Sequence, residues 1–376
     1  VRFEFVDEPH CDDEAYMVGT SIFFSNNSKN KLLEYKYDGS IQRDNANDIS
    51  KFIYPTFIED NIVRVAVEET PQQRIFCLTK SGVVYVLTYQ RQEDYYAWSK
   101  LEMSDATILD LGVVRQGYAS GLDQVFAIVK RRGLIQHELL SSVSKLENEP
   151  TVYLDSSETG LASPDDSNYN QTTKTYTINL TNRYVFEDGL EVDVVFGGVY
   201  LGKFTVTNGS VSVSVLIGEN ERWVVGFKYS GAVQPMYPTW DGTNKPAYGS
   251  DNIRIISSKL YVIDSVRYDI GVDGNMETIT LPNYVSPTDK APLDPSVYTA
   301  NLLDSASLSL RSSDLFYLRS FLDYTGTTLL QSSYTGFDRE KPLRGAYFGV
   351  EKTIDIEQSE PYPLTIVSLV TKTDLN

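Results

Sequence analysis

Residues 74–89 read RIFCLTKSGVVYVLTY, and this stretch decides the fold. Apolar residues dominate both sides of the short segment at 80–82, and in the second half valines alternate with tyrosine and leucine. Alternation with a period of two is typical of a strand, and a short turn containing glycine between two such runs indicates a β-hairpin. The stretch therefore predicts two antiparallel strands joined by a tight turn.

The same pattern occurs twice more in the first part of the chain. Residues 17–25 and 31–37 flank a polar turn, and residues 124–129 and 134–140 flank the turn Arg131-Arg132-Gly133. The repeats are spaced by roughly 40 to 50 residues, which is the length of one blade in several β-propeller families. A propeller-like arrangement is the expectation.

The composition agrees with a mainly β protein. The 376 residues include 26 Tyr, 16 Phe and 24 Gly but only 4 Met. Aromatic and β-branched residues favour pleated, half-buried surfaces, and glycine favours tight turns. At this length a sizeable core and two or three domains are expected.

Changes of composition along the chain divide it into three predicted parts. These are a first propeller-like part at 1–155, an inserted β-barrel or β-sandwich module at 156–235, and strands that return to the propeller at 236–376. Short apolar runs at 176–230 lie between two polar, irregular stretches, as expected for an inserted module. One short helix is predicted at 314–322.

The net charge excludes one class of partner. With 33 basic and 51 acidic residues the formal net charge is −18. Proteins that grip DNA or anionic membranes do so with clustered Lys and Arg, so a polyanion would on average be repelled. No apolar run is long enough to span a bilayer, and no signal peptide is recognisable. The chain begins at Val1, which suggests a fragment or a processed form.

Few residues suit metal binding or nucleophilic catalysis. The only cysteines are Cys11 and Cys77, and the only histidines are His10 and His137. His10-Cys11 precedes three acidic residues, which could supply metal ligands but fit a solvated acidic loop better. The motifs of common enzyme classes are absent, so no catalytic residue, no cofactor and no metal site is predicted.

Two features leave a carbohydrate-related function open. Acidic residues are numerous enough for the carboxylate pair of a glycosidase, although no pair stands out. Trp98 follows a charged turn, where it would be a core aromatic or, if exposed, a platform for stacking on a sugar. The alternatives to a structural protein are therefore a carbohydrate-binding adhesin and a propeller-type glycoside hydrolase.

Five segments in order resemble one family. Residues 73–99 are similar to a blade of the tail nozzle proteins of short-tailed bacteriophages, also called tail tubular protein B or tail stabilisation proteins. Further similar segments are 153–156, 190–195, 224–229 and 354–366. Little of residues 1–70 matches, which suggests that the N-terminal part is missing or divergent.

The resemblance implies a structural virion protein, a subunit of the tail nozzle that forms a channel for DNA ejection and contributes to host attachment. The small number of candidate nucleophiles, bases and metal ligands predicts that it has no enzymatic activity. The resemblance also implies a propeller interrupted by a β module, assembled as a homohexamer in the phage tail below the adaptor ring. Its expected partners are the adaptor or portal-side tail proteins, tail fibres or spikes, the host cell surface, and double-stranded DNA passing through the channel without sequence-specific binding. A strongly acidic ring would let DNA slide. The scarce basic residues are candidates for subunit contacts in such a ring, namely Arg131, Arg132, Arg339 and Arg344.

Overall fold

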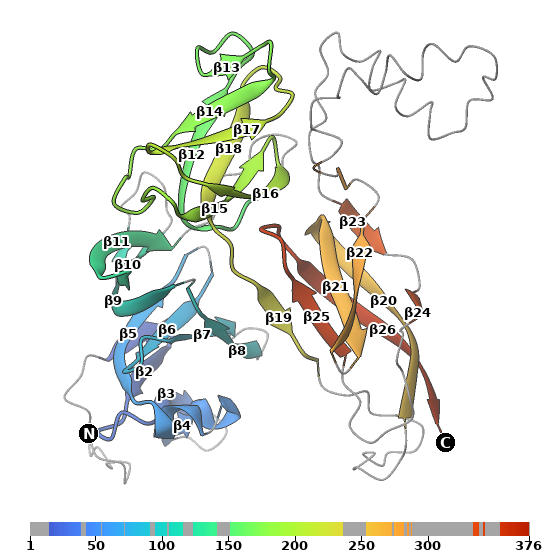
Figure 1. The fold of residues 1–376 in the computed structure, drawn as a ribbon. Helices are drawn as coiled ribbons and strands as arrows, with labels where there is room; N and C mark the ends of the chain where they lie inside the picture. The colour runs from blue at the N-terminus through green and yellow to red at the C-terminus, as the bar shows by residue number, and fades with distance from the viewer. Residues whose placement is uncertain are drawn as a thin grey trace. The chain divides into compact units, whose positions relative to one another are not determined.

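The protein consists almost wholly of antiparallel β-sheets in the computed structural model (Figure 1). The residues that the structure describes are 15–38, 43–53, 55–70, 72–90, 95–103, 105–115, 123–140, 151–235, 253–272, 274–281, 284–285, 287, 334–337, 341–342 and 354–375. They fall into two compact units, Val1–Ser141 and Ser142–Asn376. Each unit is described by itself.

The first unit begins with two four-stranded meanders. In one of them a turn at Gly19 (φ 62°) divides the predicted strand 17–25 into β1 and β2. Glycine fits this left-handed conformation because it lacks a Cβ. The strands of the two sheets, in order, are β1 (Tyr16–Val18), β2 (Ser21–Ser25), β3 (Leu32–Asp38) and β4 (Arg43–Asp48), then β5 (Ile62–Glu68), β6 (Arg74–Thr79), β7 (Val84–Gln90) and β8 (Tyr95–Leu101).

The predicted hairpin of residues 74–89 forms the centre of the second sheet. Strands β6 and β7 pair with Cys77 opposite Tyr85. Their apolar residues reach two cores, one on each face of the sheet, which explains why both alternating sets are apolar. The short elements η1 (Ser50–Ile53) and α1 (Thr56–Glu59) lie between the two meanders in the chain.

The third predicted hairpin is also confirmed. Strands β10 (Asp123–Arg131) and β11 (Leu134–Leu140) are joined by a turn in which Arg132 and Gly133 have φ of 47° and 87°. With β9 (Ala106–Arg115) they form a three-stranded sheet. Successive antiparallel meanders are the form of propeller blades. The predicted fold class, mainly β and propeller-like, is confirmed.

Strands β12 to β18 of the second unit form two sheets that share one core (Figure 1). One sheet has the order β12-β18-β15-β16 and the other β13-β14-β17, and both contribute to one buried cluster. Two sheets around one core define a sandwich, the second of the two predicted architectures. The strands are β12 (Asp155–Ala162), β13 (Tyr169–Asn170), β14 (Thr175–Asn179), β15 (Glu191–Phe196), β16 (Val199–Thr205), β17 (Ser210–Ser214) and β18 (Glu221–Phe227).

The rest of the second unit contains two further sheets. One has the order β19-β25-β21-β22, and in the other β20 pairs with β23, β24 and β26. The prolines after Glu360 separate β25 from β26. The boundaries 155 and 235 stay predictions, and the helix predicted at 314–322 lies outside the described residues. The strands are β19 (Gly231–Val233), β20 (Ile253–Ser265), β21 (Arg267–Val272), β22 (Asn275–Thr280), β23 (Tyr334–Phe337), β24 (Lys341–Pro342), β25 (Ile354–Gln358) and β26 (Thr365–Leu375).

The helical elements within the described residues are short. None of them has the length and apolar character needed to cross a membrane.

The sandwich contains a tyrosine whose titration we expect to weaken the fold at high pH. Tyr176 donates a hydrogen bond to Asp166 Oδ2 at 2.9 Å, and burial and this carboxylate raise the pKa of Tyr176 from 10.0 to about 12. The unfolded chain loses this proton first, so the free energy of unfolding falls as the pH rises from 10.0 to about 12.

Tyr176→Phe removes both the hydrogen bond and this titration. We expect the variant to be less stable by about 1 kcal/mol at neutral pH, with a difference that shrinks above pH 10. Urea unfolding of both chains at neutral pH and above pH 10 measures it. A difference that stays constant would contradict the assignment.

Candidate active site

The sheet β19-β25-β21-β22 has one apolar and one polar face. In β21, Tyr268, Ile270 and Val272 are buried in the core. Successive side chains in a strand point to opposite faces, so Arg267 and Asp269 lie on the other face. The candidate site is built on this polar face and on the residues that follow β25.

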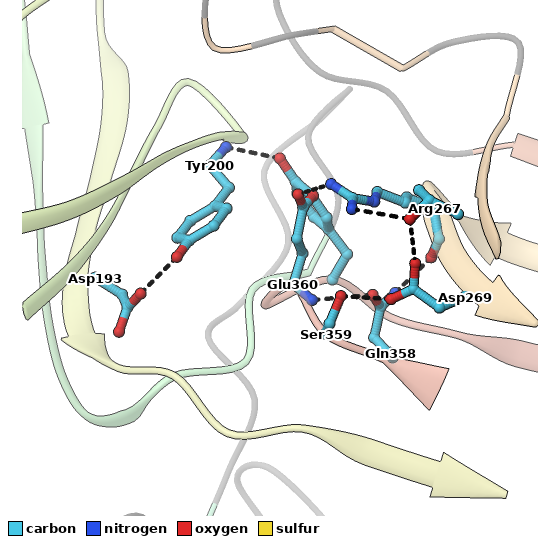
Figure 2. Close-up of polar contacts among 9 residues, drawn as sticks. Asp193, Tyr200, Arg267, Asp269, Gln358, Ser359 and Glu360 are labelled. Atoms are coloured by element: carbon cyan, nitrogen blue, oxygen red, sulfur yellow. Dashed lines mark hydrogen bonds and ion pairs between the residues drawn. The ribbon is translucent and has the colours of Figure 1, made fainter. Parts of the chain in front are cut away.

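Asp269 is held in place by two hydroxyl groups (Figure 2). Thr278 Oγ1 donates to Asp269 Oδ1 at 2.6 Å, and Ser359 Oγ donates to Asp269 Oδ2 at 2.6 Å. Thr278 is exposed, whereas Asp269 itself is buried, with 9% of its surface exposed. Glu357 lies directly opposite Asp269 in the strand register. Two carboxyl-bearing residues therefore share the same face of the sheet.

Glu360 faces Arg267 across the site (Figure 2). The Arg267 guanidinium donates to Glu360 Oε1 in an ion pair. Gln358 orients both partners, because its Nε2 donates to the Arg267 carbonyl at 2.6 Å and its Oε1 accepts from the Glu360 N–H at 3.2 Å. The Glu360 side chain is 11% exposed. Among the described residues, its buried Oε2 has no hydrogen-bond partner.

The environment of Glu360 favours its protonated form. Burial raises the pKa of the Glu360 carboxyl above its usual value of 4.5, since removal from water penalises the charge. The cations of Arg267 and Lys228 act in the opposite direction, whereas the negative charge of Asp269 adds to the rise. The pKa of Glu360 is therefore raised despite its ion pair.

Two tyrosines connect this site to the sandwich. The Tyr200 N–H donates to the Tyr362 hydroxyl oxygen at 2.7 Å, and the Tyr200 hydroxyl donates to Asp193 Oδ1 at 2.6 Å. Burial raises the pKa of both tyrosines, with the hydrogen bond to Asp193 as a further cause for Tyr200. The Lys228 ammonium lies 5.4 Å from the centre of the Tyr200 ring. The tyrosines therefore stay protonated and serve as hydrogen-bonding supports.

This arrangement provides the two kinds of group that acid–base hydrolysis needs. A buried carboxylic acid with a raised pKa keeps its proton at a higher pH than a free glutamate does, and it can donate that proton. A second carboxylate on the same face can stabilise positive charge or accept a proton. Arg267 and Gln358 fix the position of the acid.

Gly271 keeps the backbone of this sheet close-packed. A Cβ built on Gly271 would lie 2.2 Å from the carbonyl oxygen of Asn275. Because the obstacle is backbone, we expect Gly271→Ala to reduce the free energy of unfolding by about 3 kcal/mol. Urea denaturation measures this loss. Gly231→Ala is the control, because a Cβ at Gly231 would meet nothing within 4 Å, and equal stability of the two variants would contradict the expectation.

The arginines predicted as subunit contacts are not part of this site. Arg131 is buried and pairs with Glu138 Oε1 at 3.3 Å, whereas Arg132 is exposed at the turn. Arg339 and Arg344 lie outside the described residues. The role of the four arginines as subunit contacts stays a prediction. The Arg131 side chain already has a partner, Glu138, within its own sheet.

The other residues singled out in the sequence have ordinary environments. Trp98 packs edge-on against Phe57, with ring centres 5.7 Å apart, and its Nε1–H donates to the Ile49 carbonyl at 3.0 Å, as expected of a core aromatic. His137 is exposed on β11. Cys77 is buried as a free thiol, and burial raises its pKa. His10 and Cys11 lie outside the described residues, within which no three His, Cys, Asp or Glu side chains are grouped to hold a metal.

Sequence reasoning did not identify Glu360, Arg267 or Asp269 as a site. In the sequence, Glu360 belongs only to the segment 354–366, which resembles the tail nozzle family. The association of the three residues depends on the pairing of β21 with β25, which are far apart in the chain. The one available signal was an acidic residue next to prolines at the end of a strand.

Comparison with known proteins gives only distant likenesses. No family model and no curated protein matches the chain. Among solved structures, the chain is similar to an exo-β-1,3-galactanase from Phanerochaete chrysosporium with galactose, at 10% identity and a TM-score of 0.24 over 95% of both chains. A variant of that enzyme with β-1,3-galactotriose matches at 9% identity and a TM-score of 0.23 over 95% of this chain and 94% of the other.

These matches correct two expectations. The matching structures are glycoside hydrolases and not tail proteins, so the predicted function as a tail nozzle subunit and the predicted lack of enzymatic activity are wrong. Likenesses this distant supply no correspondence between residues of the two proteins. The family resemblance, the hexameric ring, its partners and the virion location stay predictions.

Proposed function

We propose that this protein hydrolyses glycosidic bonds, with Glu360 as the proton donor. The observation that carries the proposal is the Glu360 carboxyl itself. It is mostly buried, its pKa is raised, and its Oε2 is without a partner among the described residues. A structural ion pair with Arg267 would use the charged carboxylate alone, and nothing in that role requires a raised pKa or an unpaired oxygen.

The proposed step uses residues from both sides of the site. Glu360 donates its proton to the leaving-group oxygen as the bond from that oxygen to the anomeric carbon breaks. Water adds to the anomeric carbon, and Asp269 accepts the proton that this water releases. Exchange with solvent then returns Asp269 and Glu360 to their starting states. Arg267 orients Glu360 through the ion pair to Oε1, which leaves Oε2 to act.

The substrate class that we propose is a neutral glycan. The net charge of −18 repels polyanionic polysaccharides, and the proposed site adds the carboxyl groups of Asp269, Glu360 and Glu357, the last of which lies opposite Asp269. A neutral sugar carries no charge that these carboxylates would repel, and its hydroxyl groups can donate hydrogen bonds to the carboxylate oxygens.

The test is the release of reducing ends from neutral oligosaccharides. The panel includes β-1,3-galactotriose, cellotetraose and maltotetraose, each incubated with the full chain. We expect release from at least one of them, unchanged in Glu219→Gln, which alters an exposed glutamate on the turn before β18. Absence of release from the whole panel, or release that does not depend on Glu360, would contradict the proposed function.

A further inference from the structure

We infer that Phe52 and Tyr96 form a glycan-binding platform in the first unit. Both side chains are exposed, Phe52 by 57% and Tyr96 by 41%. Their ring centres are 5.3 Å apart and the rings are tilted by 50°. Two large rings that face solvent side by side form one contiguous apolar surface, and contiguous exposed apolar surfaces mark binding sites more often than scattered single side chains do.

The platform is supported by the rigid core beneath it. Phe52 belongs to η1, and Tyr96 belongs to β8, the edge strand of its sheet. Trp98, two residues after Tyr96, donates through Nε1–H to the carbonyl of Ile49, just before η1. This hydrogen bond connects the two elements that carry the rings. The two rings are therefore fixed in place before a ligand binds. Little conformational entropy would then be lost on binding, which favours affinity.

The size of the surface favours a small ligand over a protein. A stable protein interface buries about 800 Å² on each partner. Phe and Tyr side chains bury roughly 150 to 250 Å² each when fully covered, so two half-exposed rings offer roughly 200 Å². That area is comparable with the C–H face of one or two sugar rings.

Charge and hydrogen bonding favour a neutral oligosaccharide as the ligand. The Lys51 ammonium lies 5.2 Å from the centre of the Phe52 ring and can donate to sugar hydroxyl groups beside the stacked face. The surplus of acidic residues over the whole chain disfavours a polyanionic glycan. This inference extends the proposed function to a second site, and it rests on that function only for the class of ligand.

Binding is tested by isothermal titration of β-1,3-galactotriose, cellotetraose and maltotetraose. The titrations use Glu360→Gln so that little substrate is consumed during the measurement. We expect at least one sugar to bind, and Phe52→Ala and Tyr96→Ala each to weaken its binding tenfold or more. Phe52→Trp, which keeps an aromatic surface, should bind within about threefold of the parent. Tyr184→Ala is the matched control, because Tyr184 is 79% exposed in the sandwich, and it should not change the affinity.

The outcomes separate the two sites. No binding of any of these sugars overturns the platform, and so does binding that is unchanged in both alanine variants. If hydrolysis fails while platform-dependent binding persists, the proposed function alone is wrong. If the wild-type chain hydrolyses the sugars and the alanine variants bind them normally, the platform alone is wrong.

Discussion

Glu360→Gln is expected to lower the rate of glycoside hydrolysis by about 10²- to 10⁴-fold, the usual contribution of a general acid. Glutamine has nearly the same shape and can still accept from Arg267, so the sheet should keep its structure. What the variant lacks is the proton that Glu360 donates. Initial rates of reducing-end release at saturating substrate measure the effect.

Two companion variants distinguish chemistry from structural damage. Glu360→Asp keeps a carboxylic acid on a side chain that is one methylene group shorter, so this variant should retain more activity than Glu360→Gln. Glu219→Gln should match the wild-type chain. Unchanged kcat in Glu360→Gln, or equal losses in all three variants, would remove Glu360 from its proposed role.

Phe196→Ala is expected to reduce the free energy of unfolding of the sandwich by about 3 to 5 kcal/mol. Phe196 is 0% exposed and packs edge-on against Tyr176, with ring centres 5.6 Å apart. Removal of the ring leaves a cavity between the two sheets, because neighbouring strands cannot collapse into it fully. Urea denaturation monitored by circular dichroism measures this loss.

The control for Phe196→Ala lies in the same sandwich. Leu161 of β12 is 57% exposed, so Leu161→Ala removes a large apolar side chain without opening a buried cavity. We expect it to change the free energy of unfolding by about 0.5 kcal/mol or less. A similar loss in both variants would show that residues 155–227 do not have the core described here.

The local structure was predictable from the sequence where a single alternating pattern was enough. The hairpin at 74–89 and the turn at Arg132-Gly133 depend on neighbouring residues, and both form as predicted. The division of 17–25 into two strands was missed, because the left-handed turn at Gly19 separates two short apolar runs, 17–18 and 22–24, that were interpreted as one strand.

The candidate site could not be predicted in the same way. Asp269 and Glu357 become neighbours only when β21 pairs with β25, and no local pattern specifies that register. The raised pKa of Glu360 comes from burial, which depends on the packing of distant segments. Likewise, exposure decides whether Tyr96 or Trp98 can stack on a sugar, and alternation along β8 alone does not distinguish them.

The pH dependence of kcat/KM for the wild-type chain and Glu360→Gln tests the central claim most directly. Glu360 must be protonated to act, so the wild-type kcat/KM should fall as the pH rises through a pKa above 4.5, the usual value for glutamate. In Glu360→Gln the residual activity should lack this decrease. A decrease at the same pH in both chains would contradict the assignment of Glu360 as the proton donor.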